Sequence, residues 1–106
     1  MDLAVLTYQA SVNFPKYEQY RLTLQLTGAI TSVPGNTAEG HARSTRKDYA
    51  YFLSIAKGSL MESETYVILA ERLGYLTPTT SDDLLSRIVE ISKMLTVLRS
   101  KLVANS

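Results

Sequence analysis

The 106-residue chain contains no cysteine, no tryptophan and one histidine, with only three prolines and five glycines. Without cysteine the chain has no disulfide framework, no thiolate metal site and no cysteine nucleophile. No apolar run approaches the roughly 20 residues that cross a bilayer. The first residues also lack the basic segment that opens a signal peptide. We therefore expect a cytoplasmic protein that does not interact with membranes.

An excess of charge of either sign is missing too. Eleven basic and ten acidic residues leave a formal net charge of +1 at pH 7, which produces little long-range field. Any binding of nucleic acid must therefore depend on a local cluster of basic residues. Hydrophobic residues make up 45% of the sequence, as is ordinary for a globular protein, and the length suits one domain covering residues 1–106.

The sequence also lacks the patterns that support catalysis or cofactor binding. A di-iron site in a helical bundle needs two Glu-x-x-His motifs, whereas His41 has no glutamate three residues before it. One histidine among scattered serines does not form a Ser-His-Asp triad. A phosphate-binding loop and a Gly-x-Gly-x-x-Gly motif are missing as well. We expect a non-enzymatic protein with no catalytic residue, no metal site and no cofactor.

What the sequence does contain is helical periodicity. Near the C-terminus, apolar residues recur at alternating spacings of four and three, which places them on one stripe of a helix starting near Thr79 or Ser81. They are Leu84, Ile88, Ile91, Leu95, Leu98 and Leu102. The stretch from Thr79 to Ser81, followed by Asp82 and Asp83, is the expected start of this helix. Residues 45–73 form another predicted helix, capped by Ser44 or Thr45 and ended by Gly74. Helices are also predicted at about residues 2–12 and 17–42. Because short connections favour antiparallel neighbours, we predict an all-α, up-down-up-down four-helix bundle.

Pro34 lies inside the second predicted helix, where it removes a backbone N–H and clashes with the preceding turn. We therefore predict a kink in this helix near Pro34. Asn36 and Glu39 are candidates to satisfy the backbone groups that the proline frees, and Gly40 to allow close passage of another backbone. The alternative is that Asn36 and Glu39 line a subunit or ligand surface.

A dense basic cluster lies at the junction of the second and third predicted helices, where His41, Arg43, Arg46 and Lys47 follow closely on one another. Arg43, Arg46 and Lys47 are candidates to hold phosphates, assisted by hydroxyls and N–H groups at the helix start. Tyr51 is a candidate to stack on bases. The alternative is a solvated helix junction with no binding role.

The last predicted helix carries more apolar residues than its core stripe requires. Met94 and Val97 lie off the stripe and are candidates for an oligomer interface, since exposed apolar patches usually mark protein contacts. The alternative is a broader core.

Several segments together resemble one known family. They are Phe14-Pro15, Tyr20-Arg21-Leu22, Ser32-Val33-Pro34-Gly35-Asn36-Thr37-Ala38-Glu39-Gly40, Leu53-Ser54-Ile55-Ala56-Lys57-Gly58-Ser59 and Leu73-Gly74-Tyr75-Leu76. Their Pro-x-Asn-x-Ala-Glu-Gly and Ile-Ala-x-Gly-Ser elements are similar to those of the four-helix bundle proteins encoded in intervening sequences of large-subunit ribosomal RNA genes, called S23-type proteins. The resemblance covers nearly the whole chain.

The resemblance implies a homo-oligomer, a ring-like pentamer, in which each subunit repeats the basic cluster around the axis. It favours binding of RNA or a nucleoprotein through this junction. The alternative is a protein-interaction scaffold with no affinity for nucleic acid. The chain begins about where the first helix of that family is already under way, so the resemblance also predicts a short first helix.

Overall fold

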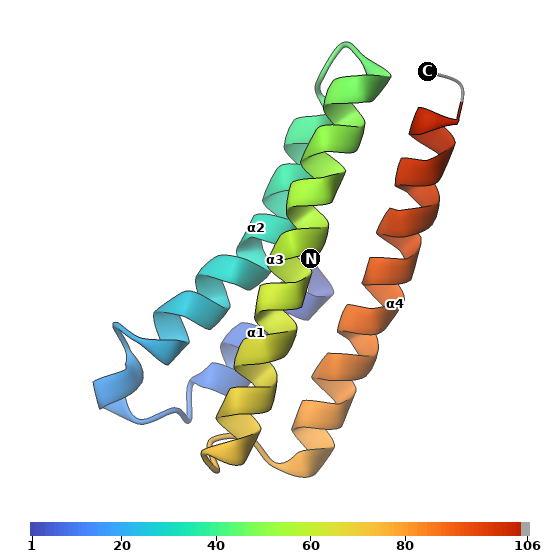
Figure 1. Ribbon diagram of the computed structural model, residues 1–106. Coiled ribbons are helices and arrows are strands. Elements are labelled where there is room, and N and C mark those ends of the chain that lie inside the picture. The colour runs from blue at the N-terminus through green and yellow to red at the C-terminus, as the bar shows by residue number, and fades with distance from the viewer. Residues whose placement is uncertain (105–106) are drawn as a thin grey trace.

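The computed structural model, which describes residues 1–104, consists of four α-helices and one short 3₁₀ turn (Figure 1). The elements are α1 (Asp2–Ser11), η1 (Lys16–Glu18), α2 (Leu22–His41), α3 (Arg46–Arg72) and α4 (Pro78–Val103). The described residues contain no β-strand, and the predicted all-α, four-helix fold is confirmed. In Figure 1 the chain direction alternates from α2 to α3 to α4, which is compatible with the expected up-down order. None of the described helices combines the length and hydropathy needed to cross a membrane.

The starts of α3 and α4 are both capped by threonine. Thr45 Oγ1 accepts a hydrogen bond from Asp48 N at 3.1 Å, and Thr77 Oγ1 accepts one from Thr80 N at 3.2 Å. Of the two expected cap candidates, Ser44 and Thr45, the cap is therefore Thr45. The expected start of the last helix at Thr79 or Ser81 is wrong, because Pro78 occupies the first helical position. Proline is favoured there, since its φ suits the helix and its missing N–H has no intrahelical partner to lose.

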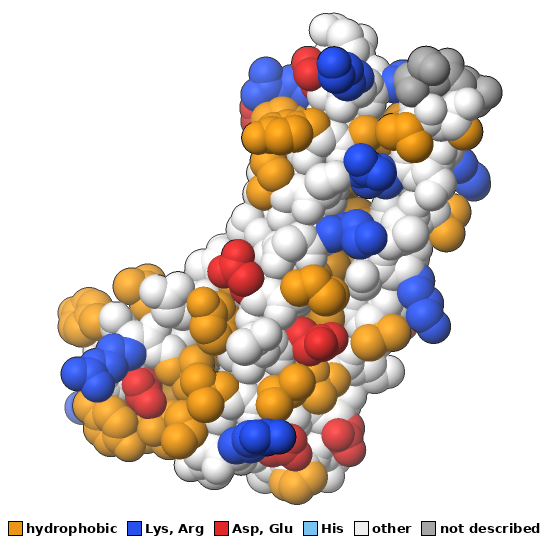
Figure 2. Space-filling model, in the orientation of Figure 1, with side chains coloured by type: hydrophobic (Ala, Val, Ile, Leu, Met, Phe, Trp, Pro, Cys, Tyr) orange, Lys and Arg blue, Asp and Glu red, His pale blue; other side chains and the backbone are white. Residues whose placement is uncertain are grey.

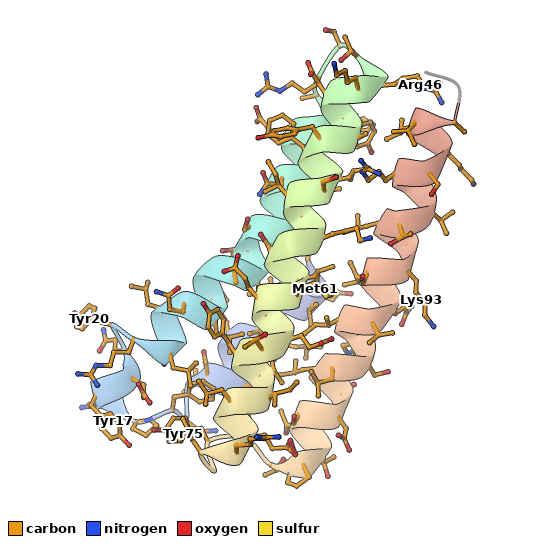
Figure 3. All side chains as sticks on the ribbon, in the orientation of Figure 1. Tyr17, Tyr20, Arg46, Met61, Tyr75 and Lys93 are labelled. Atoms are coloured by element: carbon orange, nitrogen blue, oxygen red, sulfur yellow. The ribbon has the colours of Figure 1, made fainter. Side chains whose placement is uncertain are left out.

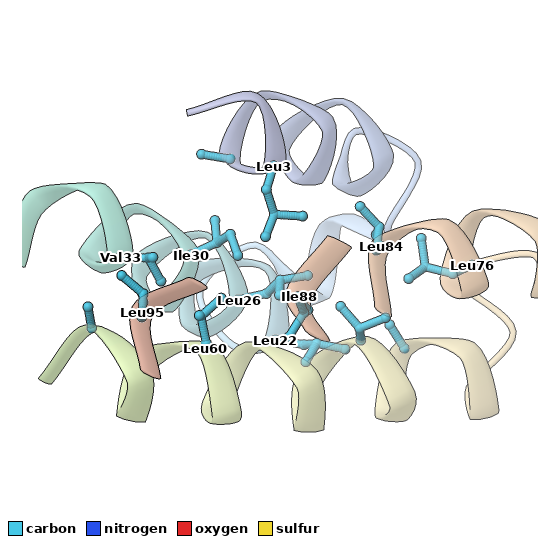
Figure 4. Close-up of a cluster of buried hydrophobic side chains, with 14 of the residues drawn as sticks. Leu3, Leu22, Leu26, Ile30, Val33, Leu60, Leu76, Leu84, Ile88 and Leu95 are labelled. Atoms are coloured by element: carbon cyan, nitrogen blue, oxygen red, sulfur yellow. The ribbon is translucent and has the colours of Figure 1, made fainter. Parts of the chain in front are cut away.

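The core is built on α3, whose two heptad lines are buried. The first line is Leu53, Leu60 and Val67, and the second includes Ala56, Ser63 and Ala70, each with 0–1% of its surface exposed. Leu22, Leu26, Ile30 and Val33 of α2 and Leu84, Ile88 and Leu95 of α4 belong to the same buried cluster, which is shown in Figure 4. The small side chains on the second line of α3 allow neighbouring helices to approach closely.

Helix α1 covers only part of this core. It contacts both α2 and α4, whereas α2 and α4 make no close backbone contact with each other among the described residues. Leu3 and Ala4 are buried, and Figure 4 shows Leu3 pointing from α1 into the core. In Figure 1 the N-terminus lies level with the middle of α3. Four helices therefore surround the core at one end of the molecule and three at the other.

Helix α2 begins at Leu22, later than expected, and continues through Pro34 without a break. Figure 1 shows that it bends along its length. Besides the proline, four side chains donate hydrogen bonds of 2.8–2.9 Å to the carbonyl four residues earlier, a contact that often bends helices. They are Thr27, Thr31, Asn36 and Thr37.

Asn36 and Gly40 fix the contact between α2 and α3. Asn36 Nδ2 donates to Ser32 Oγ at 2.8 Å, and Ser59 Oγ of α3 donates to the same oxygen at 2.9 Å. Gly40 is buried, and a Cβ atom placed there would lie 2.8 Å from Phe52 Cβ of α3. Glu39 differs from the expectation, because its carboxylate pairs with Arg43 on the surface and not with backbone near Pro34.

At the opposite end of the molecule, a tyrosine network connects η1 to the loop between α3 and α4 (Figure 3). The Tyr75 hydroxyl donates to Glu18 Oε2 at 2.8 Å and lies 3.1 Å from the Tyr17 hydroxyl. These hydrogen bonds, to Tyr17 first and then to Glu18, raise the pKa of Tyr75 well above its ordinary value. The Phe14 ring packs 5.5 Å from that of Tyr75, so this network holds the α1–α2 connection against the bundle.

We expect Gly40→Ala to lower the free energy of unfolding by about 1–2 kcal/mol, because overlap with Phe52 outweighs the better helix propensity of alanine. Gly35→Ala is the matched control, since nothing in the described chain lies within 4 Å of a Cβ atom placed there. This control should be as stable as the wild type or slightly more stable. Urea denaturation measures both. Equal stability of the two variants would show that α3 does not restrict position 40.

Candidate functional site

Charged side chains are divided between the two ends of the α3–α4 hairpin. Residues 40–61 and 91–103, which lie toward the α2–α3 loop, carry seven basic residues and one acidic residue. Residues 62–90 carry six acidic residues and two basic ones. Figure 2 shows Lys and Arg mostly over the upper half of the visible face. The near-zero net charge therefore conceals a local positive region, called here the basic end and defined by Arg43, Arg46, Lys47, Arg99 and Lys101.

Arg46 connects the beginning of α3 to the end of α4 (Figure 3). Its Nε donates to the carbonyl oxygen of Leu102 at 3.2 Å, and its Nη2 donates to that of Lys101 at 2.9 Å. Carbonyls in the last turn of a helix lack intrahelical partners and form the negative end of the helix dipole. Arg46, a candidate phosphate ligand by sequence, therefore also has a structural role as a cap on α4.

Arg43, the second arginine of the predicted cluster, is held on the surface by two neighbours. It forms an i,i+4 ion pair with Glu39, and its guanidinium carbon lies 4.7 Å from the centre of the Phe52 ring. The His41 ring packs edge-on against Tyr49 at 5.8 Å. Arg43 keeps N–H donors free for a further acceptor, but Glu39 partly offsets its charge.

Lys47 and Tyr51 line a shallow groove between α3 and α4, with a volume of about 520 Å³. Its lining consists of Lys47, Ala50, Tyr51, Ser54, Arg99 and Val103. Arg99 Nε donates to Ser54 Oγ at 2.7 Å, which positions the guanidinium at this groove. Tyr51 is 62% exposed. Two cations and an exposed aromatic ring thus share one surface, and within residues 1–104 no acidic side chain lines it.

The predicted cluster did not include Arg99 and Lys101, which α4 adds to it. Ser54 and Arg99 lie at similar distances along the chain from the Leu73–Thr77 loop, so folding the two helices back on each other brings them together. The predicted antiparallel order, combined with counting from the loop, could therefore have identified both basic residues.

The exposed apolar side chains include two groups of interest. Met94 and Val97, the predicted interface residues on α4, are 62% and 54% exposed. A second group lies around η1, the start of α2 and the end of α3, and appears as the orange area at the lower left of Figure 2. It includes Tyr17, Tyr20, Leu24, Leu69 and Leu73. This second group was not among the interface residues predicted from the sequence.

Metal-ligating side chains are not gathered at either surface. Among residues 1–104, no three or more His, Asp or Glu side chains form a group that could hold a metal ion.

Comparisons with known proteins agree on one family. Residues 1–97 match the model of the family described as 23S rRNA-intervening sequence protein. The fold is similar to a crystal structure from Bacteroides thetaiotaomicron, described as a protein with unknown function from the S23 ribosomal protein family. The two chains are 25% identical, with a TM-score of 0.83 over 92% of this chain and 92% of that chain. No curated protein matches the sequence significantly.

We expect Arg46→Ala to lower the free energy of unfolding by about 1 kcal/mol, because two carbonyls at the end of α4 lose a charged donor. The neighbouring substitution Lys47→Ala is the control and should change stability by less than about 0.5 kcal/mol. Urea denaturation gives both values, and hydrogen exchange should show faster opening of the last turn of α4 in Arg46→Ala alone. Indistinguishable variants would contradict the capping role.

Proposed function

The chain belongs to the 23S rRNA-intervening sequence protein family, and from this premise we propose that it is a non-enzymatic, cytoplasmic, oligomeric protein that binds RNA or a nucleoprotein through its basic end. The observation that carries this proposal is the convergence of basic side chains from the α2–α3 loop, the start of α3 and the end of α4. Such a cluster supplies the phosphate contacts that dominate nucleic-acid affinity.

Within the basic end, the groove between α3 and α4 offers the least obstructed contacts. Lys47 forms no ion pair within residues 1–104, and Arg99 uses one N–H on Ser54, so four of its five donors remain available. Arg46 and Arg43 supply further donors beyond their structural partners. Tyr51 presents a ring beside these cations on which an unpaired base can stack.

Self-association would strengthen binding of this kind. In a closed ring every subunit presents its basic end in an equivalent position, so several phosphate contacts can form along one RNA. We propose a pentamer, on the resemblance described above, with Met94 and Val97 in the contact between subunits. Their exposure on α4 supports an interface there.

The alternative function is a protein-interaction scaffold without affinity for nucleic acid. The second exposed apolar group, around Tyr20 and Leu73, favours this alternative, because it provides a contact surface remote from the basic end.

RNA binding is tested by fluorescence anisotropy of a structured ribosomal RNA fragment, titrated at several salt concentrations. We expect affinity to fall steeply with salt, because each phosphate that a cation neutralises adds about 0.7–0.9 to the slope of log K against log salt. Lys47→Ala with Arg99→Ala should therefore reduce this slope by about 1.5. Arg72→Ala with Arg87→Ala is the matched control, since it removes the same charge from the acidic half of the hairpin.

Equal effects of the two double variants would show that the basic end is not the binding surface. No binding by the folded, assembled protein would favour the scaffold.

The subunit contact is tested by native mass spectrometry of the wild type and of Met94→Lys with Val97→Lys. We expect the wild type to form a five-subunit species and the variant to dissociate, since buried lysines lack partners. Val5→Lys with Val12→Lys, which also replaces two exposed apolar residues, should leave assembly unchanged. A monomeric wild type, or a variant that still assembles, would contradict the proposed interface.

A further inference from the structure

The groove between α3 and α4 at the basic end holds its two cations in different ways. Arg99 Nε donates to Ser54 Oγ at 2.7 Å, and the Ser54 hydroxyl donates to the Ala50 carbonyl oxygen at 3.2 Å. This chain of hydrogen bonds ties the guanidinium to α3 and leaves its two Nη groups to bind a ligand. Lys47 forms no ion pair within residues 1–104, and its flexible side chain can adjust to the same ligand.

The other lining residues give the groove an apolar part beside the charged one. Ala50, which is buried, and Val103 contribute apolar surface. The Tyr51 ring meets the Phe52 ring edge-on, with 5.4 Å between ring centres and 80° between ring planes, so a neighbour supports its orientation. The volume of about 520 Å³ lies in the range of small-molecule pockets. A phosphate joined to one aromatic base, which is a single nucleotide, matches this combination of surfaces.

The charge of the lining favours a terminal phosphate over an internal one. An internal phosphodiester carries one negative charge on two unshared oxygens. A phosphomonoester carries close to two charges at neutral pH and presents three oxygens. The Nη groups of Arg99 can contact two of these oxygens as a fork, and Lys47 can contact the third. Within residues 1–104 no acidic side chain lines the groove, so the second charge of the monoester meets no repulsion there.

We propose that this groove binds the terminal nucleotide of a single-stranded RNA that carries a phosphomonoester at its end. The inference rests on the proposed RNA binding and names the part of the RNA that the groove selects. The phosphate lies between Arg99 and Lys47, and the terminal base stacks on Tyr51. The end of the strand is unpaired, because a base within a duplex is stacked on its own neighbours and cannot turn its face to the tyrosine.

The preference is measured by fluorescence anisotropy with RNA hexamers of one sequence, labelled identically in the middle of the strand. One hexamer has a 5′-phosphate, one a 3′-phosphate, and one a hydroxyl at both ends. An octamer with hydroxyl ends has nearly the same total charge as the phosphorylated hexamers and is the control for charge alone. At pH 7.5 we expect one phosphorylated hexamer, which identifies the end selected, to bind at least fivefold more tightly than both hydroxyl RNAs.

The pH dependence of this preference tests whether the second phosphate charge is recognised. The second pKa of a phosphomonoester is about 6, so the group carries close to one charge at pH 5. We expect the fivefold preference to fall to about twofold or less at pH 5. The hydroxyl hexamer, measured at each pH, corrects for any titration of the protein itself. A preference that stays constant between pH 7.5 and pH 5 would overturn the proposal.

The groove is identified with Lys47→Ala combined with Arg99→Ala, which should reduce the preference to less than twofold. Arg72→Ala with Arg87→Ala is the matched control from the acidic half of the hairpin and should keep the full preference. Arg99→Lys keeps the charge but removes the fork, and we expect it to lower the preference about threefold. Circular dichroism shows whether each variant is folded. A preference that survives in the folded Lys47 and Arg99 double variant would overturn the proposal.

The same titrations separate this inference from the proposed function. Equal binding of the phosphorylated hexamers and the hydroxyl octamer, with affinity still lost in the Lys47 and Arg99 double variant, would overturn the inference and leave RNA binding at the basic end in place. Binding of a structured ribosomal RNA fragment without binding of any short RNA would have the same meaning. No binding of any RNA by the folded protein would contradict both.

Discussion

Burial of α3 between α2 and α4 is the interaction on which the other features depend. Its two heptad lines leave almost no surface exposed, and small side chains at Ala56, Ser63 and Ala70 let the neighbouring helices come near. Gly40 permits the observed packing of α2 on α3, since a Cβ atom there would overlap Phe52, and the hydrogen bond between Ser59 and Ser32 adds a polar contact across the interface. The position of the α2–α3 loop, and of the basic residues that follow it, is a consequence of this packing.

Antiparallel packing also explains how a chain with almost no net charge acquires a positive end. Each half of the α3–α4 hairpin combines residues from the beginning of one helix with residues from the end of the other. The basic residues near position 46 therefore meet those near position 100, and Arg46 joins the two directly through the carbonyls of Lys101 and Leu102. Charge that looks dispersed along the sequence becomes concentrated in space.

Periodicity predicted the last helix and its core stripe, in which Leu84, Ile88 and Leu95 are buried, because a spacing of about 3.6 residues places side chains on one face of a helix. Local chemistry predicted the Thr45 cap for a related reason: both partners lie within one turn. Three features of the structure could not be predicted from the sequence. Pro78 suits the end of one helix and the start of the next equally well. The Glu39 carboxylate could accept a hydrogen bond from the backbone near Pro34 or form an ion pair with Arg43, one turn away, and the sequence does not distinguish these two contacts. The contact of Arg46 with α4 joins residues more than fifty positions apart, so no local pattern records it.

The placement of α1 has a consequence for the order in which the protein forms during synthesis. Helices α3 and α4 can each pack on the helix that precedes them, and contacts of this local kind form quickly. One of the two partners of α1 is α4, the last helix to be translated. The packing of α1, which buries Leu3 and Ala4, is therefore complete only after α4 has emerged. Among the four helices, the one translated first is therefore the last to complete its contacts, and chaperones that bind apolar segments have the longest access to it.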